Sequence, residues 1–140
     1  MPTLIKPELS ITSKYHISKE RYYELKYFCL QYYQWVKEYK ELDKNFDVGH
    51  YISYHDYDNY NLANPTAKLA LKKQILAENI KVVEDAAAEC DRVLGRFVFI
   101  GVTQKMPYDK LRSQYLCPCG RELYYDRYRK FFKILSDKRN

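Results

Sequence analysis

The sequence predicts an all-α protein, and three observations support this fold class. The 140 residues include only 4 Gly and 5 Pro, too few for the many turns of an all-β chain. Apolar residues make up 46% of the chain, which is enough to form a core. They recur in long stretches at the three- and four-residue spacings of a helix. We therefore expect an N-terminal hairpin of long helices within residues 1–94 and a helix-turn-helix within residues 95–140.

The first long helix is expected after Ser18, whose side chain can cap a helix N-terminus. Alternating steps of three and four residues form a heptad seam that predicts one helix over its whole length. The seam consists of Leu25, Phe28, Tyr32, Trp35, Tyr39 and Leu42. Residues 43–64 are rich in Asp and Asn, which predicts a long loop. Tyrosines recur at every third position of this loop, at Tyr51, Tyr54, Tyr57 and Tyr60.

The second long helix is expected from Thr66 to about Leu94, since Pro65 favours the first turn of a helix. It carries a second heptad seam. The two seams suit an intramolecular antiparallel pair and a homodimer equally well. Residues 96–100 form a short apolar run that could be a strand or a helix. We favour a helix because the rest of the chain offers no partner strand.

The last part of the chain reads as two helices joined by a tight turn. Pro107 favours the start of a short helix over residues 108–115, and Pro118 cannot continue it. A final helix is expected from near Arg121 to about Asp137. Its apolar face consists of Tyr124, Tyr128, Phe131, Phe132 and Leu135. This order of elements is typical of a helix-turn-helix, whose second helix contacts DNA.

The charge distribution supports this hypothesis. Residues 105–140 hold ten Lys and Arg against four Asp and Glu, an excess that equals the formal charge of the whole chain, +6. We expect Arg121, Glu122 and Tyr125, at the start of the last helix, to contact base edges. The expected phosphate contacts are Arg127, Arg129, Lys130, Lys133, Lys110 and Arg112. A solvated basic face on an ordinary amphipathic helix is the alternative interpretation.

The chain resembles the RinA/ArpU-type transcriptional regulators of phages and prophages in Gram-positive bacteria. The resemblance lies in the order of Tyr23–Leu42, Asp43–Asn64, Thr66–Leu94 and Lys105–Lys138, and above all in the helix that begins Arg121-Glu-Leu-Tyr-Tyr. It implies a C-terminal helix-turn-helix similar to region 4 of sigma factors. It also implies binding to double-stranded promoter DNA, activation of phage late genes and RNA polymerase as a partner. The Cys-Pro-Cys-Gly turn at residues 117–120 departs from the family pattern.

Other classes of protein have less support in the sequence. The chain has no Gly-rich phosphate loop, no Ser/His/Asp order and no zinc spacing, so we expect neither an enzyme nor a metal or cofactor. Without a signal peptide or an apolar span, a cytoplasmic location in the host bacterial cell is expected. With 16 tyrosines, the main alternative is a non-enzymatic phage protein. Such a protein would inhibit a host or defence factor through a tyrosine-rich surface.

Overall fold

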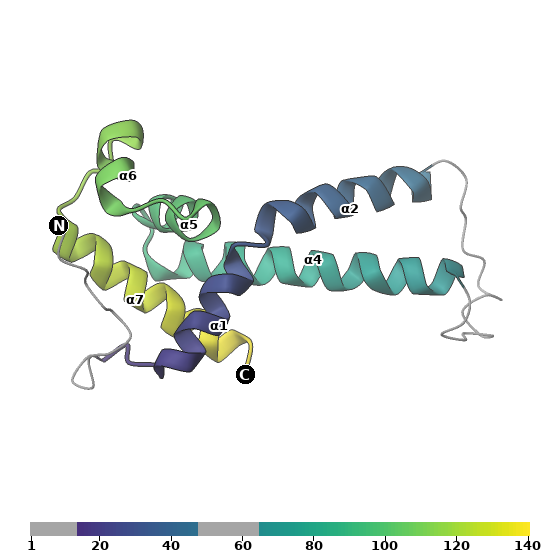
Figure 1. Cartoon of the computed structure of the whole chain (residues 1–140), viewed down its shortest axis with the longest axis horizontal. Helices are drawn as coiled ribbons and strands as arrows, with labels where there is room; N and C mark the ends of the chain where they lie inside the picture. Colours follow the sequence, from purple (N-terminus) through teal and green to yellow (C-terminus); the bar gives the residue numbers. More distant parts are fainter. Residues whose placement is uncertain (1–13, 48–64) are drawn as a thin grey trace. The chain divides into compact units, whose positions relative to one another are not determined.

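The computed structural model describes residues 14–47 and 65–140, and these residues form six helices and no strand (Figure 1). The all-α prediction is therefore confirmed. The helices are α1 (Lys19–Cys29), α2 (Tyr32–Asp47), α4 (Pro65–Cys90), α5 (Gly95–Gln104), α6 (Tyr108–Tyr115) and α7 (Arg121–Lys138). Within the described ranges, no helix combines the length and the apolar character that crossing a lipid bilayer requires.

The N-terminal helix is interrupted, which corrects the expectation of one continuous helix. The Ser18 side chain caps α1 as expected, at 3.1 Å from a backbone amide of the first turn. Leu30 and Gln31 then separate α1 from α2. The amide of Gln31 donates to the carbonyl of Phe28 at 3.2 Å, a three-residue bond that tightens and ends the helix. The heptad seam crosses this break, which contains neither Gly nor Pro, so the pattern does not reveal it.

Two other boundaries differ from the expected ones. Helix α2 continues to Asp47, so the first residues of the expected 43–64 loop are helical, and the tyrosines at 51–60 lie outside the described residues. Helix α4 ends at Cys90, before the expected end at Leu94. The carboxylate of Asp91 accepts hydrogen bonds from the backbone amides of Val93 and Leu94 at 2.8 and 2.7 Å. Asp91 therefore replaces the last expected turn of α4 with a capped turn that leads into α5.

The chain divides into two compact units. One comprises Met1–Tyr32 with Val82–Asn140, and the other is Tyr33–Lys81. The boundary expected after residue 94 falls inside the first unit. In the second unit, Lys73 of α4 forms a 2.5 Å ion pair with Asp43 of α2 and lies 5.3 Å from the centre of the Tyr39 ring. These contacts hold α2 against the first part of α4.

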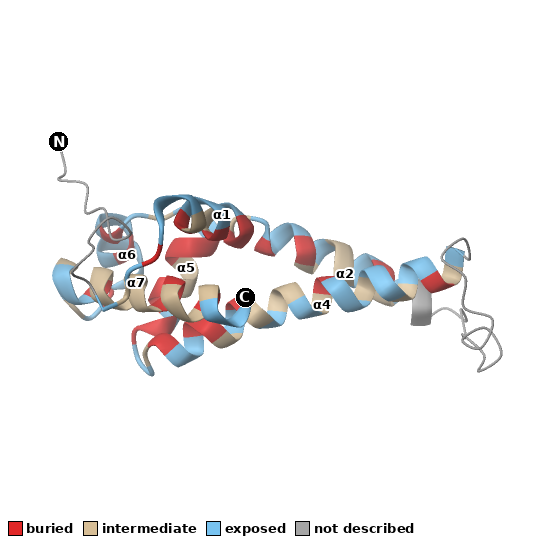
Figure 2. Cartoon of the chain, turned by 90° about the horizontal axis from the view of Figure 1, so that it is seen from below, coloured by how far each residue is buried: buried red, intermediate tan, exposed pale blue. Residues whose placement is uncertain are grey.

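Helix α5 is central to the packing of the first unit. It packs against α1, α6 and α7, and α7 also packs against α1. Residues 96–100 are helical, which confirms the preference for helix over strand. Buried residues recur along α5, as Figure 2 shows in red. Gly95 lets the start of α5 approach α4 closely, because a Cβ atom there would lie 2.3 Å from the carbonyl oxygen of Ala87 on α4.

Candidate nucleic-acid interface and an adjoining cavity

Helices α5, α6 and α7 form the part of the chain that was expected to bind DNA. Helix α6 ends at Leu116, which has left-handed backbone angles of φ 55° and ψ 45°. The amide of Cys117 donates a hydrogen bond to the carbonyl of Leu111 at 3.3 Å, as in a helix C-terminal cap. Gly120, which precedes α7, has an ordinary φ of −78°. The left-handed residue is thus Leu116, and its conformation directs the chain from α6 into α7.

Side chains of α6 hold the turn in place. The Tyr108 hydroxyl donates to the carbonyl of Cys119 at 2.6 Å, and Arg112 donates to the carbonyl of Cys117 at 2.7 Å. Cys117 is fully buried, and its sulfur lies 3.7 Å from that of Cys119 with both thiols free. Of the Cys-Pro-Cys segment, Cys117 therefore belongs to the apolar core, whereas Pro118 is exposed and Cys119 is half-buried. Arg112, an expected phosphate contact, is engaged with this turn.

Arg121 begins α7 and is held against α6. Its guanidinium lies 2.6 Å from the carboxylate of Asp109 and 5.5 Å from the centre of the Tyr108 ring. The Asp109 side chain is 64% exposed, and an ion pair so open to water contributes about 1 kcal/mol or less. Arg121 can therefore exchange Asp109 for another anion at low cost.

Arg127 is bound within the first unit. It donates to Asp91 at 2.8 Å and to the adjacent Asp126 at 2.6 Å. Burial raises the pKa of Asp91, but hydrogen bonds from the amides of Leu94 and Val93 and from Arg127 outweigh it and hold the pKa below its usual value. One carboxylate thus caps the turn before α5 and anchors α7. This arrangement differs from the phosphate contact expected for Arg127.

Tyr125 and Glu122 lie three positions apart on α7, so they are neighbours on its surface, but they differ in exposure. Tyr125 borders the buried face, with its ring centre 5.0 Å from that of Tyr124 and 5.5 Å from that of Tyr128. It therefore does not lie opposite the buried face, where a residue that contacts base edges was expected. Glu122 is exposed. The three expected base-edge residues therefore lie on one side of the first turns of α7, where Glu122 is exposed and Arg121 and Tyr125 are half-buried.

Four of the expected phosphate contacts remain open to an anion. Arg129 and Lys130 are half-buried and Lys110 is exposed, and within residues 14–47 and 65–140 no carboxylate forms an ion pair with any of them. Lys133 lies 3.3 Å from Asp137 in an exposed pair on the same helix. These four residues make up the open cations of the candidate interface.

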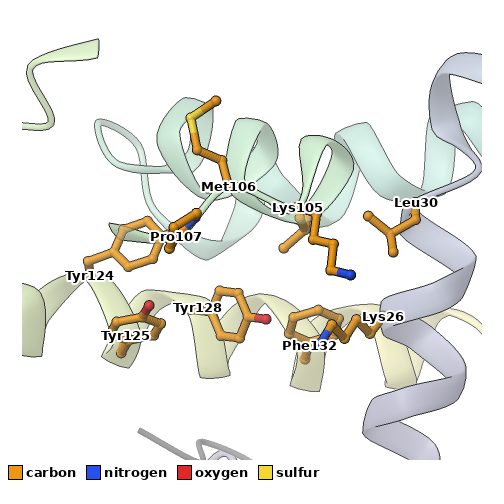
Figure 3. Close-up of a pocket in the computed structure, with 11 residues that line it drawn as sticks. Lys26, Leu30, Lys105, Met106, Pro107, Tyr124, Tyr125, Tyr128 and Phe132 are labelled. Carbon is orange, nitrogen blue, oxygen red and sulfur yellow. The ribbon is translucent and has the colours of Figure 1, made fainter. Parts of the chain in front are cut away.

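A cavity of about 340 Å³ lies beside the buried face of α7 (Figure 3). Its walls come from the end of α1, from the end of α5 with the following loop, and from α7. The lining residues include Lys26, Leu30, Val102, Lys105, Tyr124, Tyr128 and Phe132. The sequence pattern singled out only the aromatic residues of α7 among them. It did not indicate a cavity, because the packing of three separate segments brings these residues together.

Comparisons with known proteins identify no relative. No protein-family model matches the chain, and neither a curated protein nor a solved structure is significantly similar to it. The resemblance to RinA/ArpU-type regulators therefore stays a prediction. Any function assigned to the chain has to rest on its own residues.

Proposed function

We propose that the chain is a sequence-specific DNA-binding regulator of transcription that uses α7 as its recognition helix. The observation that carries the proposal is the left-handed turn at Leu116, which joins a short helix to a longer one while α5 packs against both. Two helices joined by a short turn are the basic elements of a DNA-binding helix-turn-helix, and this supports the proposal. The cation excess of residues 105–140 supports the same interpretation.

The open cations Lys110, Arg129, Lys130 and Lys133 are the proposed phosphate contacts. Glu122 is exposed near the start of α7, where it can accept a hydrogen bond from cytosine. Arg121 reaches guanine only after it leaves Asp109. Arg112 and Arg127 have a positioning role in this proposal, since they hold the turn and α7 in place. Activation of phage late genes alongside RNA polymerase is the regulatory role that the family resemblance implies.

Fluorescence anisotropy with a labelled mixed-sequence duplex of 30 base pairs tests the proposal. The double variant Arg129→Ala/Lys130→Ala should bind about tenfold more weakly than the unmodified protein, because two phosphate contacts are lost. The control Lys37→Ala/Lys40→Ala removes the same charge from exposed positions of α2 and should bind nearly normally. Equal losses in the two variants, or no loss in the first, would refute the proposed interface.

The second candidate is an interaction protein with a tyrosine-rich binding face. Tyr23 and Tyr27 of α1 favour it, because these residues are 38% and 58% exposed. A Tyr23→Ala/Tyr27→Ala variant separates the two candidates. It should retain DNA binding if the protein is a DNA-binding regulator. It should lose a captured host protein, identified by mass spectrometry, if α1 is the binding face.

A further inference from the structure

The cavity beside α7 has the size and the walls of a small-molecule site. Its volume of about 340 Å³ falls at the lower end of the range of about 300–1,000 Å³ that is usual for such sites. Apolar side chains and aromatic rings form most of the lining, among them Leu30, Val102, Pro107 and Phe132. The cavity therefore suits a compact, largely apolar molecule.

Two cations also line this apolar space. In Figure 3, Lys26 and Lys105 lie toward the end formed by Phe132, whereas Tyr124, Tyr125 and Pro107 form the other end. Across the described part of the chain, no carboxylate forms an ion pair with Lys26 or Lys105. Lys105 is exposed, and the Lys26 ammonium lies 5.8 Å from the centre of the Tyr23 ring. Two cations at one end of the cavity favour an anionic group on the ligand.

The opposite end contains a polar atom that lacks a hydrogen bond. Among the described residues, the Tyr124 hydroxyl oxygen is the one buried side-chain polar atom without a partner. It lies against Gly101, which also lines the cavity. The neighbouring Tyr128 hydroxyl is satisfied, since it forms a 2.8 Å hydrogen bond with Tyr22. An unsatisfied buried hydroxyl destabilises the fold.

We propose that this cavity binds a small amphipathic carboxylate. The carboxylate lies between Lys26 and Lys105, and the apolar body extends along Phe132 and Tyr128 toward Tyr124. A purely apolar ligand would leave the two ammonium groups without a counter-charge, and a cationic ligand would be repelled by them. The proposal goes beyond DNA binding and does not depend on it.

Isothermal titration calorimetry of the full chain tests the proposal with three probes of equal chain length. Octanoate has ten non-hydrogen atoms and carries the negative charge, octanol is neutral and octylammonium is positive. The proposal requires saturable 1:1 binding of octanoate, weaker binding of octanol and the weakest binding of octylammonium. No saturable binding of octanoate below its aggregation limit, or equal binding of all three probes, would overturn it.

Matched variants then test which cations are responsible. Lys26→Gln/Lys105→Gln should weaken octanoate binding by about tenfold and leave octanol binding unchanged, because only the charged contacts are lost. The control Lys37→Gln/Lys40→Gln removes two exposed cations of α2 that do not line the cavity and should bind octanoate normally. Circular dichroism melting confirms that each variant is folded before titration. If octanoate affinity is equal in the two variants, the assignment is wrong.

Discussion

Tyr124 shows how much one buried side chain contributes to the first unit. Its ring centre lies 5.6 Å from that of Tyr108 and 6.1 Å from that of Tyr128, so it joins α6 to the aromatic face of α7. Burial raises the pKa of its hydroxyl far above the ordinary value, and that hydroxyl has no hydrogen-bond partner. The ring is therefore stabilising, whereas the hydroxyl is not.

The two tyrosines should respond in opposite ways to loss of their hydroxyls. Tyr124→Phe should raise the free energy of unfolding by about 1 kcal/mol, because it removes an unsatisfied buried polar atom. Tyr108→Phe should lower it by about 1 kcal/mol, because the bond to the Cys119 carbonyl is lost. Urea unfolding followed by circular dichroism measures both. Destabilisation by Tyr124→Phe would show that its hydroxyl has a partner in solution.

Buried thiols give the protein a defined pH dependence. Burial raises the pKa of Cys29 and of Cys90 from the ordinary 9.0 to about 12, and that of Cys119 to about 11. The folded protein therefore holds these protons more tightly than the unfolded chain does. The free energy of unfolding should be unaffected by the thiols below pH 9 and should fall between about pH 9 and 12. Urea unfolding under reducing conditions should show this loss of stability, and the Cys90→Ala variant should lose less. A free energy of unfolding that stays constant above pH 9 would contradict the prediction.

The contact between Arg121 and Asp109 predicts an improvement in DNA binding. Asp109→Asn removes an acidic group beside the start of α7 and releases Arg121 for a base or phosphate. The affinity for duplex DNA should rise about threefold to tenfold in low salt. Glu41→Gln, an exposed position on α2 with the same change in charge, is the control for net charge. Unchanged or weaker binding by Asp109→Asn, measured by anisotropy, would exclude Arg121 from the interface.

At the scale of elements, the close approach of α5 to its neighbours requires a glycine at position 101. A Cβ atom at Gly101 would lie 2.3 Å from the Tyr124 hydroxyl oxygen and 3.3 Å from the carbonyl oxygen of Met106. Gly120 has nothing within 4 Å of its would-be Cβ atom. Gly101 therefore sets how closely α5 approaches α7, whereas Gly120 has no such role.

The different roles of Gly101 and Gly120 can be tested with three variants, whose stability is measured by thermal and urea unfolding. Gly101→Ala should destabilise the protein by about 1–3 kcal/mol through overpacking. Gly120→Ala should change the stability by less than about 0.5 kcal/mol, since its φ suits any residue. Adding Tyr124→Phe to Gly101→Ala should recover most of the loss, because the crowding hydroxyl is gone. Failure of this rescue would locate the strain elsewhere, at Met106.

Elements that are marked by Pro or capping residues could be predicted from the sequence. Pro107 and Pro118 bracket α6, which spans 108–115 as expected, and Ser18 caps α1. The break at Leu30 and Gln31 could not be predicted, because the apolar seam continues through it. It is formed by a backbone hydrogen bond that leaves no trace in residue type.

The candidate interface was predictable in charge but not in geometry. The excess of cations is a property of composition, so it is visible in the sequence. The partner of Arg127 is Asp91, 36 positions away, and the partner of Arg121 is Asp109, 12 positions away. Such pairs depend on how the helices pack. For the same reason the cavity, whose lining comes from α1, α5 and α7, was not foreseen.

At the scale of the whole molecule, the net charge is concentrated in one part of the chain. Residues 105–140 belong to the first unit and carry an excess of cations equal to the total of +6. In the rest of the chain the numbers of acidic and basic residues are equal. Such a local excess of positive charge increases the rate at which the protein encounters a polyanion, and it makes the binding of the polyanion sensitive to salt. DNA affinity should therefore depend on α6 and α7 far more than on the second unit.

The salt dependence of DNA binding tests the central claim most directly. The dissociation constant of the unmodified protein for a 30-base-pair duplex should be measured by anisotropy from low to physiological salt. If Lys110, Arg129, Lys130 and Lys133 each contact a phosphate, a plot of log affinity against log salt should have a slope of about −3 to −4. Lack of binding in low salt, or a slope near zero, would contradict the assignment of this protein as a DNA-binding regulator.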